Sequence, residues 1–275
     1  MTVDLPQTES GAAGLRAVLA DPRGTLLALD FDGTLAPIID DPEQAVAHPA
    51  AIAALARVGE LIGTVAVITG RPARTAVRLG GFAGHAGLGS LVVLGQYGVE
   101  RWNAADDSYD IPPEPAAVTA AGAELPELLA ALDLSGAHVE HKGRALGIHT
   151  RQLPDPAGAF ARLLGPLRTL ADRHDLQLEP GRYVIEIRAA GTDKGVALRS
   201  LVAETGARVV VFGGDDLGDL PAFEAVTGLR AEGTPGLLVC SASAEEDALR
   251  ERADLVVDGP AGVAQWLAAL ADQLS

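Results

Sequence analysis

Two aspartates stand one residue apart at the end of an apolar run near the start of the chain. In LLALDFDGTLAPI, residues 26–38, the run ends at Asp30, and Asp32 follows after one phenylalanine. Because side chains alternate along a strand, both carboxylates are expected on the same side of the chain. Two carboxylates in a dry crevice repel each other unless they share a proton or a divalent cation. The pair therefore predicts acid–base or metal chemistry.

A second acidic cluster follows a later apolar run. The run at 208–213 leads into Asp215, Asp216 and Asp219. Carboxylate oxygens are the hard ligands that Mg²⁺ prefers in proteins. We therefore expect Mg²⁺ as the cofactor, held between the two acidic clusters.

Groups suited to a phosphate follow apolar runs or open a predicted helix; they are Gly33, Thr69, Gly70, Arg71 and Lys194. Gln96 and Tyr97 follow the run at 91–95 and are further polar groups at the same edge. Phosphoryl oxygens are stabilised by cations and N–H donors, which a metal, a lysine and glycine-flanked amides supply. One aspartate can act as a nucleophile that forms an acyl phosphate, and the other can protonate the leaving oxygen and later activate water. Any one of these residues is more often a turn residue or a helix cap. The functional interpretation therefore depends on several strand and helix ends each supplying a suitable group at one edge of the sheet.

Short apolar runs, continuous rather than alternating, are expected to place these groups. They lie at 25–30, 64–69, 91–95, 208–213, 237–240 and 255–258. Segments with helical periodicity lie at 49–62, 194–206, 219–226 and 261–274. Buried parallel strands that alternate with helices are typical of a doubly wound, Rossmann-like α/β sheet. In such a sheet ligands bind beyond the carboxyl ends of the strands, where the groups above are found.

A different pattern begins after a proline-rich stretch at 111–118. It predicts a hairpin over 138–152, a helix over 156–174 and an alternating strand over 182–188. Half-polar strands combined with a helix indicate a small α+β domain.

We therefore predict a cap domain at residues 112–190, inserted into a core domain that comprises residues 1–111 and 191–275. Its connections near 110–115 and 188–192 are expected to act as hinges that let the cap close and exclude water.

Four motifs of the core resemble, in order, those of the haloacid dehalogenase-like phosphatases: DFDGT at 30–34, VITGR at 67–71, DKG at 193–195 and GGDDLGD at 213–219. The resemblance implies that Asp30 is the nucleophile and Asp32 the general acid and base. It implies phosphate contacts from Thr69 and Lys194, beside Gly33, Gly70 and Arg71. Mg²⁺ is implied on the Asp30 carboxylate, the Asp32 main-chain carbonyl, Asp215 and Asp216, with Asp219 in support.

Three further segments resemble trehalose-6-phosphate phosphatases: 95–102, 139–151 and 184–188. They match a G-x-x-G-x-E turn that ends at Glu100, an E-x-K pair and a later strand glutamate. The residues that the resemblance implies in sugar binding are Gln96, Tyr97, Glu140, Lys142, Arg151 and Glu186. The fourth core motif commonly reads GDDxTDE in that family and reads GDDLGDL here.

Spacing independently supports a sugar-binding face on the insert. A period of two places Glu140 and Lys142 on one face of a strand, and Glu186 opposite the apolar Ile185. Arg151 belongs to a locally basic stretch that can attract a phosphorylated sugar. The alternative is an exposed hairpin whose charges prevent edge-to-edge aggregation.

The expected activity is hydrolysis of trehalose 6-phosphate to trehalose and phosphate through an aspartyl-phosphate, a step of trehalose biosynthesis. One alternative is a related phosphatase that acts on another phosphorylated disaccharide or pseudo-disaccharide. A second, of a different class, is a catalytically silent sugar-phosphate sensor. Retention of both Asp30 and Asp32 favours an enzyme.

Composition excludes several other classes of protein. The 275 residues carry a formal charge of −16, which disfavours binding to nucleic acid and anionic membranes. Cys240 is the only cysteine, so a disulfide framework and a multi-cysteine zinc site are excluded. The sequence holds no apolar run of the roughly 18 residues that span a bilayer and no signal-like N-terminus. We expect a cytoplasmic protein whose partner is a small sugar phosphate, with no obligate protein partner.

Overall fold

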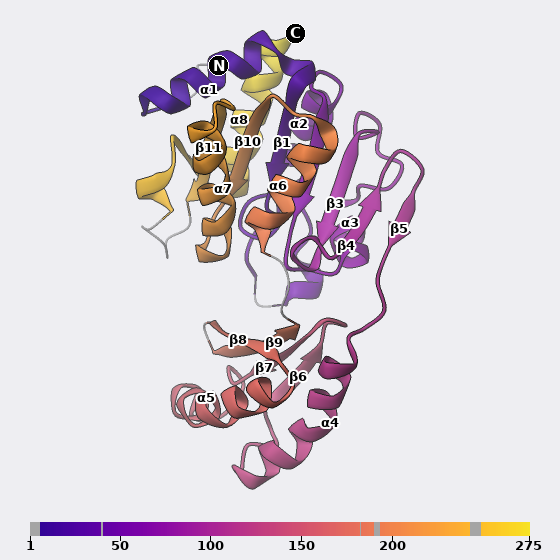
Figure 1. Cartoon of the computed structure of the whole chain (residues 1–275), viewed down its shortest axis with the longest axis vertical. Coiled ribbons are helices and arrows are strands. Elements are labelled where there is room, and N and C mark those ends of the chain that lie inside the picture. The colour runs from indigo at the N-terminus through magenta and orange to yellow at the C-terminus, as the bar shows by residue number, and fades with distance from the viewer. Residues whose placement is uncertain (1–5, 40, 182, 190–192, 243–248) are drawn as a thin grey trace. The chain divides into compact units, whose positions relative to one another are not determined.

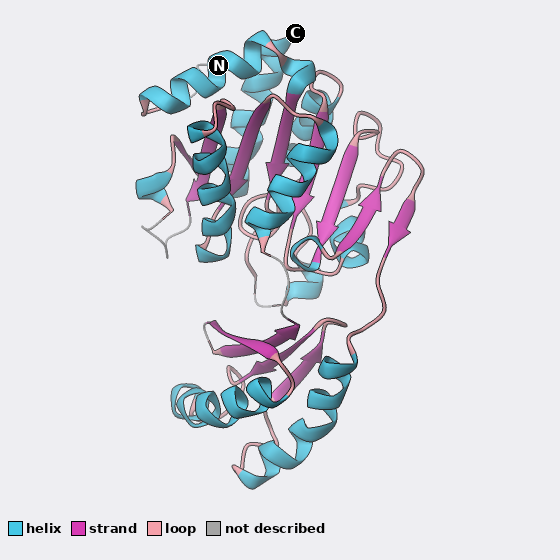
Figure 2. Ribbon diagram, viewed as in Figure 1, coloured by secondary structure: helices cyan, strands magenta, loops and turns pink. Residues whose placement is uncertain are grey.

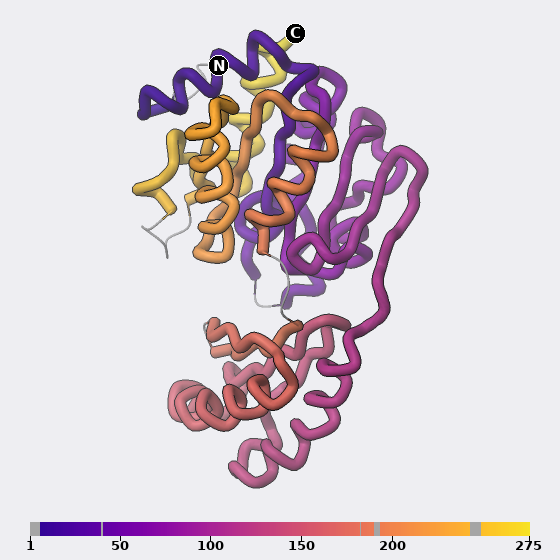
Figure 3. The backbone as a smooth tube through the Cα atoms, in the orientation of Figure 1, coloured from indigo at the N-terminus to yellow at the C-terminus, as the bar shows by residue number. Residues whose placement is uncertain are grey.

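The structure is a computed structural model that describes residues 6–39, 41–181, 183–189, 193–242 and 249–275. The chain divides into two compact units, which we call the core unit (Met1–Ile111 and Thr192–Ser275) and the inserted unit (Pro112–Gly191). Figure 3 follows the chain from the core unit into the inserted unit after Ile111. Of the second predicted hinge, residues 190–192 lie outside the described residues.

The core unit is built on one sheet with the strand order β12-β11-β10-β1-β2-β3-β4-β5 (Figure 1). The strands are β1 Thr25–Leu29, β2 Thr64–Ile68, β3 Leu91–Gly95, β4 Glu100–Asn103, β5 Ser108–Asp110, β10 Val209–Gly214, β11 Gly236–Ala242 and β12 Leu255–Asp258. All neighbouring pairs from β12 to β3 are parallel, and β4 and β5 extend one edge antiparallel. β1 lies between β2, the next strand along the chain, and β10, which follows the inserted unit. The strand order therefore reverses at β1, and ligands of such sheets bind at the carboxyl end of the strand where the order reverses, called the switch point.

Helices cover both faces of this sheet (Figure 2). They are α1 Glu9–Ala20, α2 Pro49–Gly59, α3 Ala73–Gly80, α6 Lys194–Thr205, α7 Leu220–Ala231 and α8 Gly259–Leu274. Successive residues of β1 enter opposite layers, since Leu27 and Leu29 pack with α2 and α8, whereas Leu26 and Ala28 pack with α6 and α7. A strand buried on both faces must be continuously apolar, which explains the pattern of the sequence.

The predicted doubly wound α/β core is confirmed, and each of the predicted parallel strands is present. The antiparallel strands β4 and β5 and the helices α1 and α3 are absent from the prediction. β4 alternates buried and half-buried residues and β5 is half exposed, so neither carries the apolar run that marks the central strands. Among the described residues, no helix has both the length and the apolar character to cross a membrane.

The inserted unit folds around its own core. Its antiparallel sheet has the order β6-β7-β9-β8 and comprises β6 His138–His141, β7 Ala145–His149, β8 Leu176–Gly181 and β9 Val184–Ala189. Two helices, α4 Ala116–Ala131 and α5 Pro156–Arg173, complete the unit. One face of the sheet supplies Leu146, Ile148, Ile185 and Ile187 to the core shared with these helices. The opposite face is left polar.

The sequence prediction lacks α4 and β8 of the inserted unit. The proline-rich start of α4 and the internal Pro126 obscure its helical stripe, which consists of the buried Val118, Ala121, Leu125 and Leu129. β8 has one buried residue, Leu176, and therefore no clear alternation. Tertiary packing against the neighbouring β9 stabilises both elements where local pattern is weak.

Candidate active site

The chain turns sharply where β1 ends. The Asp30 amide donates to the Gly213 carbonyl at 2.8 Å, which prolongs the pairing of β1 with β10. Beyond it, the Phe31 carbonyl accepts from the amides of Leu35 and Ala36, each at 2.8 Å, and closes a tight loop. Gly33 lies in this loop with φ +71°, and a Cβ there would overlap the Asp215 carboxylate. Glycine is therefore required by backbone conformation and by the close approach of an acidic side chain.

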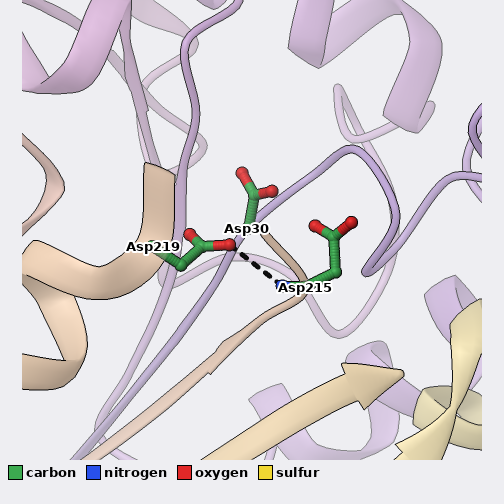
Figure 4. A group of neighbouring side chains, drawn as sticks. All are labelled: Asp30, Asp215 and Asp219. Atoms are coloured by element: carbon green, nitrogen blue, oxygen red, sulfur yellow. Dashed lines mark hydrogen bonds between the residues drawn. The ribbon is translucent and has the colours of Figure 1, made fainter. Parts of the chain in front are cut away.

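Three buried aspartates converge beside this loop. Carboxylate oxygens of Asp30, Asp215 and Asp219 all lie within 4.8 Å of one another (Figure 4). Asp219 is held by the backbone, since its Oδ2 accepts from the Asp215 amide at 2.9 Å and from the Asp216 amide at 3.3 Å. The ends of β1 and β10 thus meet in one acidic cluster.

Lys194 is the counter-ion of the cluster. Its buried Nζ lies 2.6 Å from Asp30 Oδ1 and donates to Asp219 Oδ1 at 2.7 Å. Burial lowers the pKa of this ammonium group, but the carboxylates of Asp219 and Asp30 outweigh burial and raise it well above the ordinary value. Lys194 therefore stays charged, held in place at the first turn of α6.

Negative charge exceeds positive charge in the cluster. Burial raises the pKa of Asp30 well above its ordinary value, and burial together with Asp219 and Asp216 raises that of Asp215 to about 8. Carboxylates that resist ionisation at neutral pH are relieved by a bound cation, and oxygen donors suit a hard divalent ion. The donor set fits such an ion.

This electrostatic balance predicts a pH-dependent stability. Without metal, Asp215 binds a proton in the folded protein up to about pH 8, whereas its ordinary pKa is 3.8. The folded state then holds more protons than the unfolded state between these values, so the free energy of unfolding must fall as pH rises through this window. We expect the melting temperature in EDTA to fall from pH 5 to pH 8, and Mg²⁺ to raise it more at pH 8.

The control for this prediction is Asp215→Asn, which removes the titrating group. Its melting temperature in EDTA should depend less on pH than that of the wild type, and its response to Mg²⁺ should be much smaller. Parallel pH profiles for the two proteins would contradict the assignment.

Asp32 lies apart from the cluster, although it stands only two residues from Asp30. Its carboxylate is held by Arg71 in a two-pronged ion pair, with Nε to Oδ2 and Nη2 to Oδ1 both at 2.7 Å. Arg71 is itself anchored, since its Nη1 donates to the Pro42 carbonyl at 2.9 Å and its guanidinium lies 5.6 Å from the centre of the Phe31 ring. The sequence predicts Arg71 at the phosphate, and the structure places it on Asp32.

Asp216 is also separate from the acidic cluster. Its exposed carboxylate accepts from the Gly218 amide at 2.9 Å and caps the short turn Leu217–Asp219. The sequence predicts Asp216 as a metal ligand and Asp219 as a support. The structure brings Asp219, rather than Asp216, to Asp30 and Asp215.

The loop after β2 carries Thr69, Gly70 and Arg71 and is tied to the turn after β3. The Thr69 carbonyl accepts from the Tyr97 amide at 2.9 Å, and the Arg71 carbonyl accepts from the Gln96 amide at 2.9 Å. Gln96 and Tyr97 adopt φ of 48° and 58°, a conformation that non-glycine residues rarely hold. A Cβ on Gly70 would lie 2.8 Å from the Tyr97 ring. In the core unit, Gln96 and Tyr97 thus support the predicted phosphate loop.

Polar residues of the inserted unit also meet. Lys142 Nζ donates to Glu186 Oε2 at 2.9 Å and lies 3.8 Å from Glu140 Oε2. The predicted sugar-binding trio therefore forms one cluster on the polar face of the sheet. Arg151, the other predicted residue of this unit, is exposed in the turn that follows β7.

Comparison with known proteins identifies the family. Residues 28–256 match the trehalose-phosphatase family. The chain belongs to this family. It is 34% identical over 98% of its length to a trehalose-phosphate phosphatase of Mycolicibacterium paratuberculosis, and the match covers 68% of that protein.

Solved structures show the same fold as this trehalose-phosphatase family chain. The C-terminal domain of Candida albicans trehalose-6-phosphate phosphatase aligns with a TM-score of 0.76 at 19% identity and covers 99% of each chain. Aspergillus fumigatus trehalose-6-phosphate phosphatase aligns with a TM-score of 0.67 at 22% identity over 97% of this chain and 98% of that chain.

Two residues support this site through their side chains, although the sequence analysis assigns neither of them a role. Glu100 is buried, and its Oε2 accepts from the Ala73 amide at 2.7 Å, which caps the start of α3. The buried Ser241 of β11 donates to the Gly33 carbonyl at 2.7 Å and fixes the loop after β1. The G-x-x-G-x-E turn marks Glu100 in the sequence, whereas no local pattern marks Ser241.

Proposed function

We propose that this protein hydrolyses trehalose 6-phosphate to trehalose and phosphate, with Mg²⁺ as cofactor and Asp30 as nucleophile. Membership of the trehalose-phosphatase family supports the reaction, and the names of the relatives support the substrate. The observation that carries the chemistry is the buried cluster of Asp30, Asp215 and Asp219 with Lys194 at the switch point of the sheet. We further propose a cytoplasmic enzyme that needs no protein partner.

Attack by Asp30 on phosphorus forms an acyl phosphate as the bond from phosphorus to the sugar oxygen breaks. Asp32 gives its proton to the departing sugar oxygen and afterwards takes one from the water that attacks the acyl phosphate. Phosphate is then released and Asp30 is regenerated. When bound, Mg²⁺ supplies positive charge that stabilises the developing charge on the phosphoryl oxygens.

Lys194 and the loop after β2 assist this chemistry. Lys194 holds the Asp30 carboxylate at 2.6 Å and offers positive charge next to the attacking oxygen. The Thr69 hydroxyl accepts from the Arg71 amide at 3.1 Å and is proposed to donate its own proton to a phosphoryl oxygen. Gly33 and Gly70 keep side chains away from the positions where backbone amides would face the phosphate.

Arg71 binds the carboxylate of Asp32. Both oxygens of the Asp32 carboxylate accept from Arg71 in a two-pronged ion pair, so this pair must open and Asp32 must take up a proton before it can protonate the leaving oxygen. The ion pair also keeps Asp32 distinct from the buried cluster, so the two carboxylates of DFDGT can hold different roles. The nucleophile is buried and the acid is partly exposed.

Sugar recognition is assigned to the polar cluster of the inserted unit. The carboxylates of Glu140 and Glu186 can accept hydrogen bonds from sugar hydroxyl groups. Between them lies the ammonium group of Lys142, which can donate. Several convergent donors and acceptors are what a disaccharide with many hydroxyl groups requires. A monosaccharide phosphate would satisfy fewer of them.

A substrate panel tests this proposal. We expect the kcat/KM for trehalose 6-phosphate to exceed that for glucose 6-phosphate by about 100-fold or more, because unpaired polar groups in the site penalise the smaller sugar. Sucrose 6-phosphate and mannosyl-3-phosphoglycerate represent the alternative substrates. Phosphate release is the measurement.

Other outcomes of the panel select the alternatives. A higher kcat/KM on sucrose 6-phosphate or mannosyl-3-phosphoglycerate would assign a different phosphorylated sugar. Binding of trehalose 6-phosphate without Mg²⁺-dependent release of phosphate from any compound would indicate a sensor. Comparable rates on glucose 6-phosphate would refute the role of the polar cluster.

A further inference from the structure

The polar face of the inserted sheet has an ordered layout. Glu140 on β6 lies opposite Gly147 on β7, Gly147 lies opposite Glu186 on β9, and Glu186 lies opposite Glu179 on β8. One row of acidic residues therefore crosses all the strands of this sheet and is interrupted only at Gly147. In the next row, His138 lies opposite His149.

His149 contacts the acidic row directly. Its Nε2 lies 2.9 Å from Glu140 Oε2, and an ionised carboxylate only accepts, so Nε2 carries the proton. The hydrogen bond from His149 lowers the pKa of Glu140 against the opposing effect of burial, and the charge of Lys142 adds to it. Glu140 is thereby kept as a carboxylate with a defined orientation.

Gly147 provides the space in which this pair meets. A Cβ at position 147 would lie 3.2 Å from His149 Nε2 and 3.5 Å from Glu140 Oε2. The distance to His149 Nε2 is shorter than an ordinary van der Waals contact. A side chain at position 147 would therefore push the imidazole away from the Glu140 carboxylate. Glycine within a strand commonly marks such a close approach.

The remaining neighbours complete a positioning network. The His138 ring lies 5.6 Å from the His149 ring, in a tilted arrangement on the same face. Lys142 holds Glu186 at 2.9 Å on the other side of Gly147. Oε2 of Glu140 is occupied by His149, whereas its Oε1 makes no hydrogen bond to any residue that the structure describes.

We propose that His149 is a positioning residue for substrate binding: it fixes Glu140 so that Oε1 accepts from a sugar hydroxyl, and Gly147 makes this contact possible. The inference deepens the proposed function and rests on it. His149 would not touch the reacting atoms, so its loss should weaken binding of the sugar phosphate much more than it slows chemistry.

Variants of His149 test the inference. We expect His149→Leu to raise the KM for trehalose 6-phosphate about tenfold, as expected for the loss of one charge-assisted hydrogen bond, with kcat changed less than about threefold. His149→Gln retains a donor of similar reach and should recover most of the affinity. Gly147→Val should reproduce the effect of His149→Leu. Calorimetric titration of trehalose 6-phosphate in an Asp30→Asn background should show the same changes in Kd.

Two comparisons separate positioning from a structural role. In a Glu140→Ala background, His149→Leu should have no further effect on KM, because the residue that it positions is gone. His174→Leu is the matched control, since His174 Nε2 lies 2.7 Å from Glu124 Oε1 in the same unit. This variant should keep the wild-type KM. Thermal melts monitored by circular dichroism verify that each variant is folded.

Several results would overturn the inference. One is a wild-type KM in His149→Leu, and another is an undiminished effect of that change in the Glu140→Ala background. Both leave the proposed function intact, because the wild type would still hydrolyse trehalose 6-phosphate. A wild type that neither binds nor hydrolyses this compound would overturn the proposed function and the inference together.

Discussion

Asp30→Asn is expected to abolish phosphate release, with kcat reduced by at least about 10⁴-fold, because an amide cannot form the acyl phosphate. The fold should survive. Asn has nearly the same shape, and the amide that pairs β1 with β10 belongs to the backbone. The free energy of unfolding in EDTA should stay within about 1 kcal/mol of the wild type, because Lys194 keeps its ion pair with Asp219 at 2.7 Å and the charge lost from Asp30 is disfavoured by burial. Single-turnover phosphate release and urea denaturation provide the measurements.

Asp216→Asn is the matched control for the nucleophile. It makes the same chemical change in the same neighbourhood, but this side chain caps a short turn through the Gly218 amide. An asparagine oxygen can accept that hydrogen bond equally well. Activity should fall less than about tenfold. A loss as large as that of Asp30→Asn would show that Asp216 belongs to the metal site.

Lys194→Met is expected to impair stability and activity together. The substitution leaves Asp30 and Asp219 buried without the ammonium group that lies within 2.7 Å of both. Removing one partner from a buried ion pair costs about 3–5 kcal/mol, and we expect the lower end because the carboxylates can take up protons. The rate should fall by at least about 10³-fold, since positive charge next to the phosphoryl group is lost. Urea denaturation in EDTA measures the first effect.

Two further variants test whether the loss of stability in Lys194→Met comes from unpaired buried carboxylates. Lys194→Met combined with Asp219→Asn should recover part of the lost stability, because one unpaired carboxylate is removed with its partner. Lys142→Met makes the same change at a less buried ion pair and should cost at most about 1 kcal/mol. Equal denaturation midpoints for Lys194→Met and the wild type would exclude a structural role for the buried lysine.

Much of the fold could be predicted because its central strands are buried on both faces. A strand such as β1, with Leu26 and Leu27 in opposite layers, can only be continuously apolar. Elements at the periphery carry weaker signals. β5 is half exposed, and the helical stripe of α4 is interrupted by Pro126, so their positions depend on contacts with distant parts of the chain.

Of the candidate site, the meeting of Asp30 and Asp215 could be predicted from the motifs. Asp30 and Asp215 follow buried strands, and parallel strands deliver their carboxyl ends to one edge of a sheet. Which further carboxylate joins them depends on the local turn. Leu217–Asp219 forms a 3₁₀ turn that directs Asp219 inward and leaves Asp216 exposed, and the spacing of aspartates in the sequence does not determine this choice.

The sequence by itself determined the class of sheet, which polar residues follow its strands, and that an α+β segment interrupts the core. Only the tertiary structure decided which of these residues touch: Arg71 with Asp32, Ser241 with the Gly33 carbonyl, and His149 with Glu140. The physical reason is that a motif records residue types and spacing within one short segment. Each of these contacts instead depends on strand register and turn geometry. Both are set by packing between segments that lie far apart in the chain.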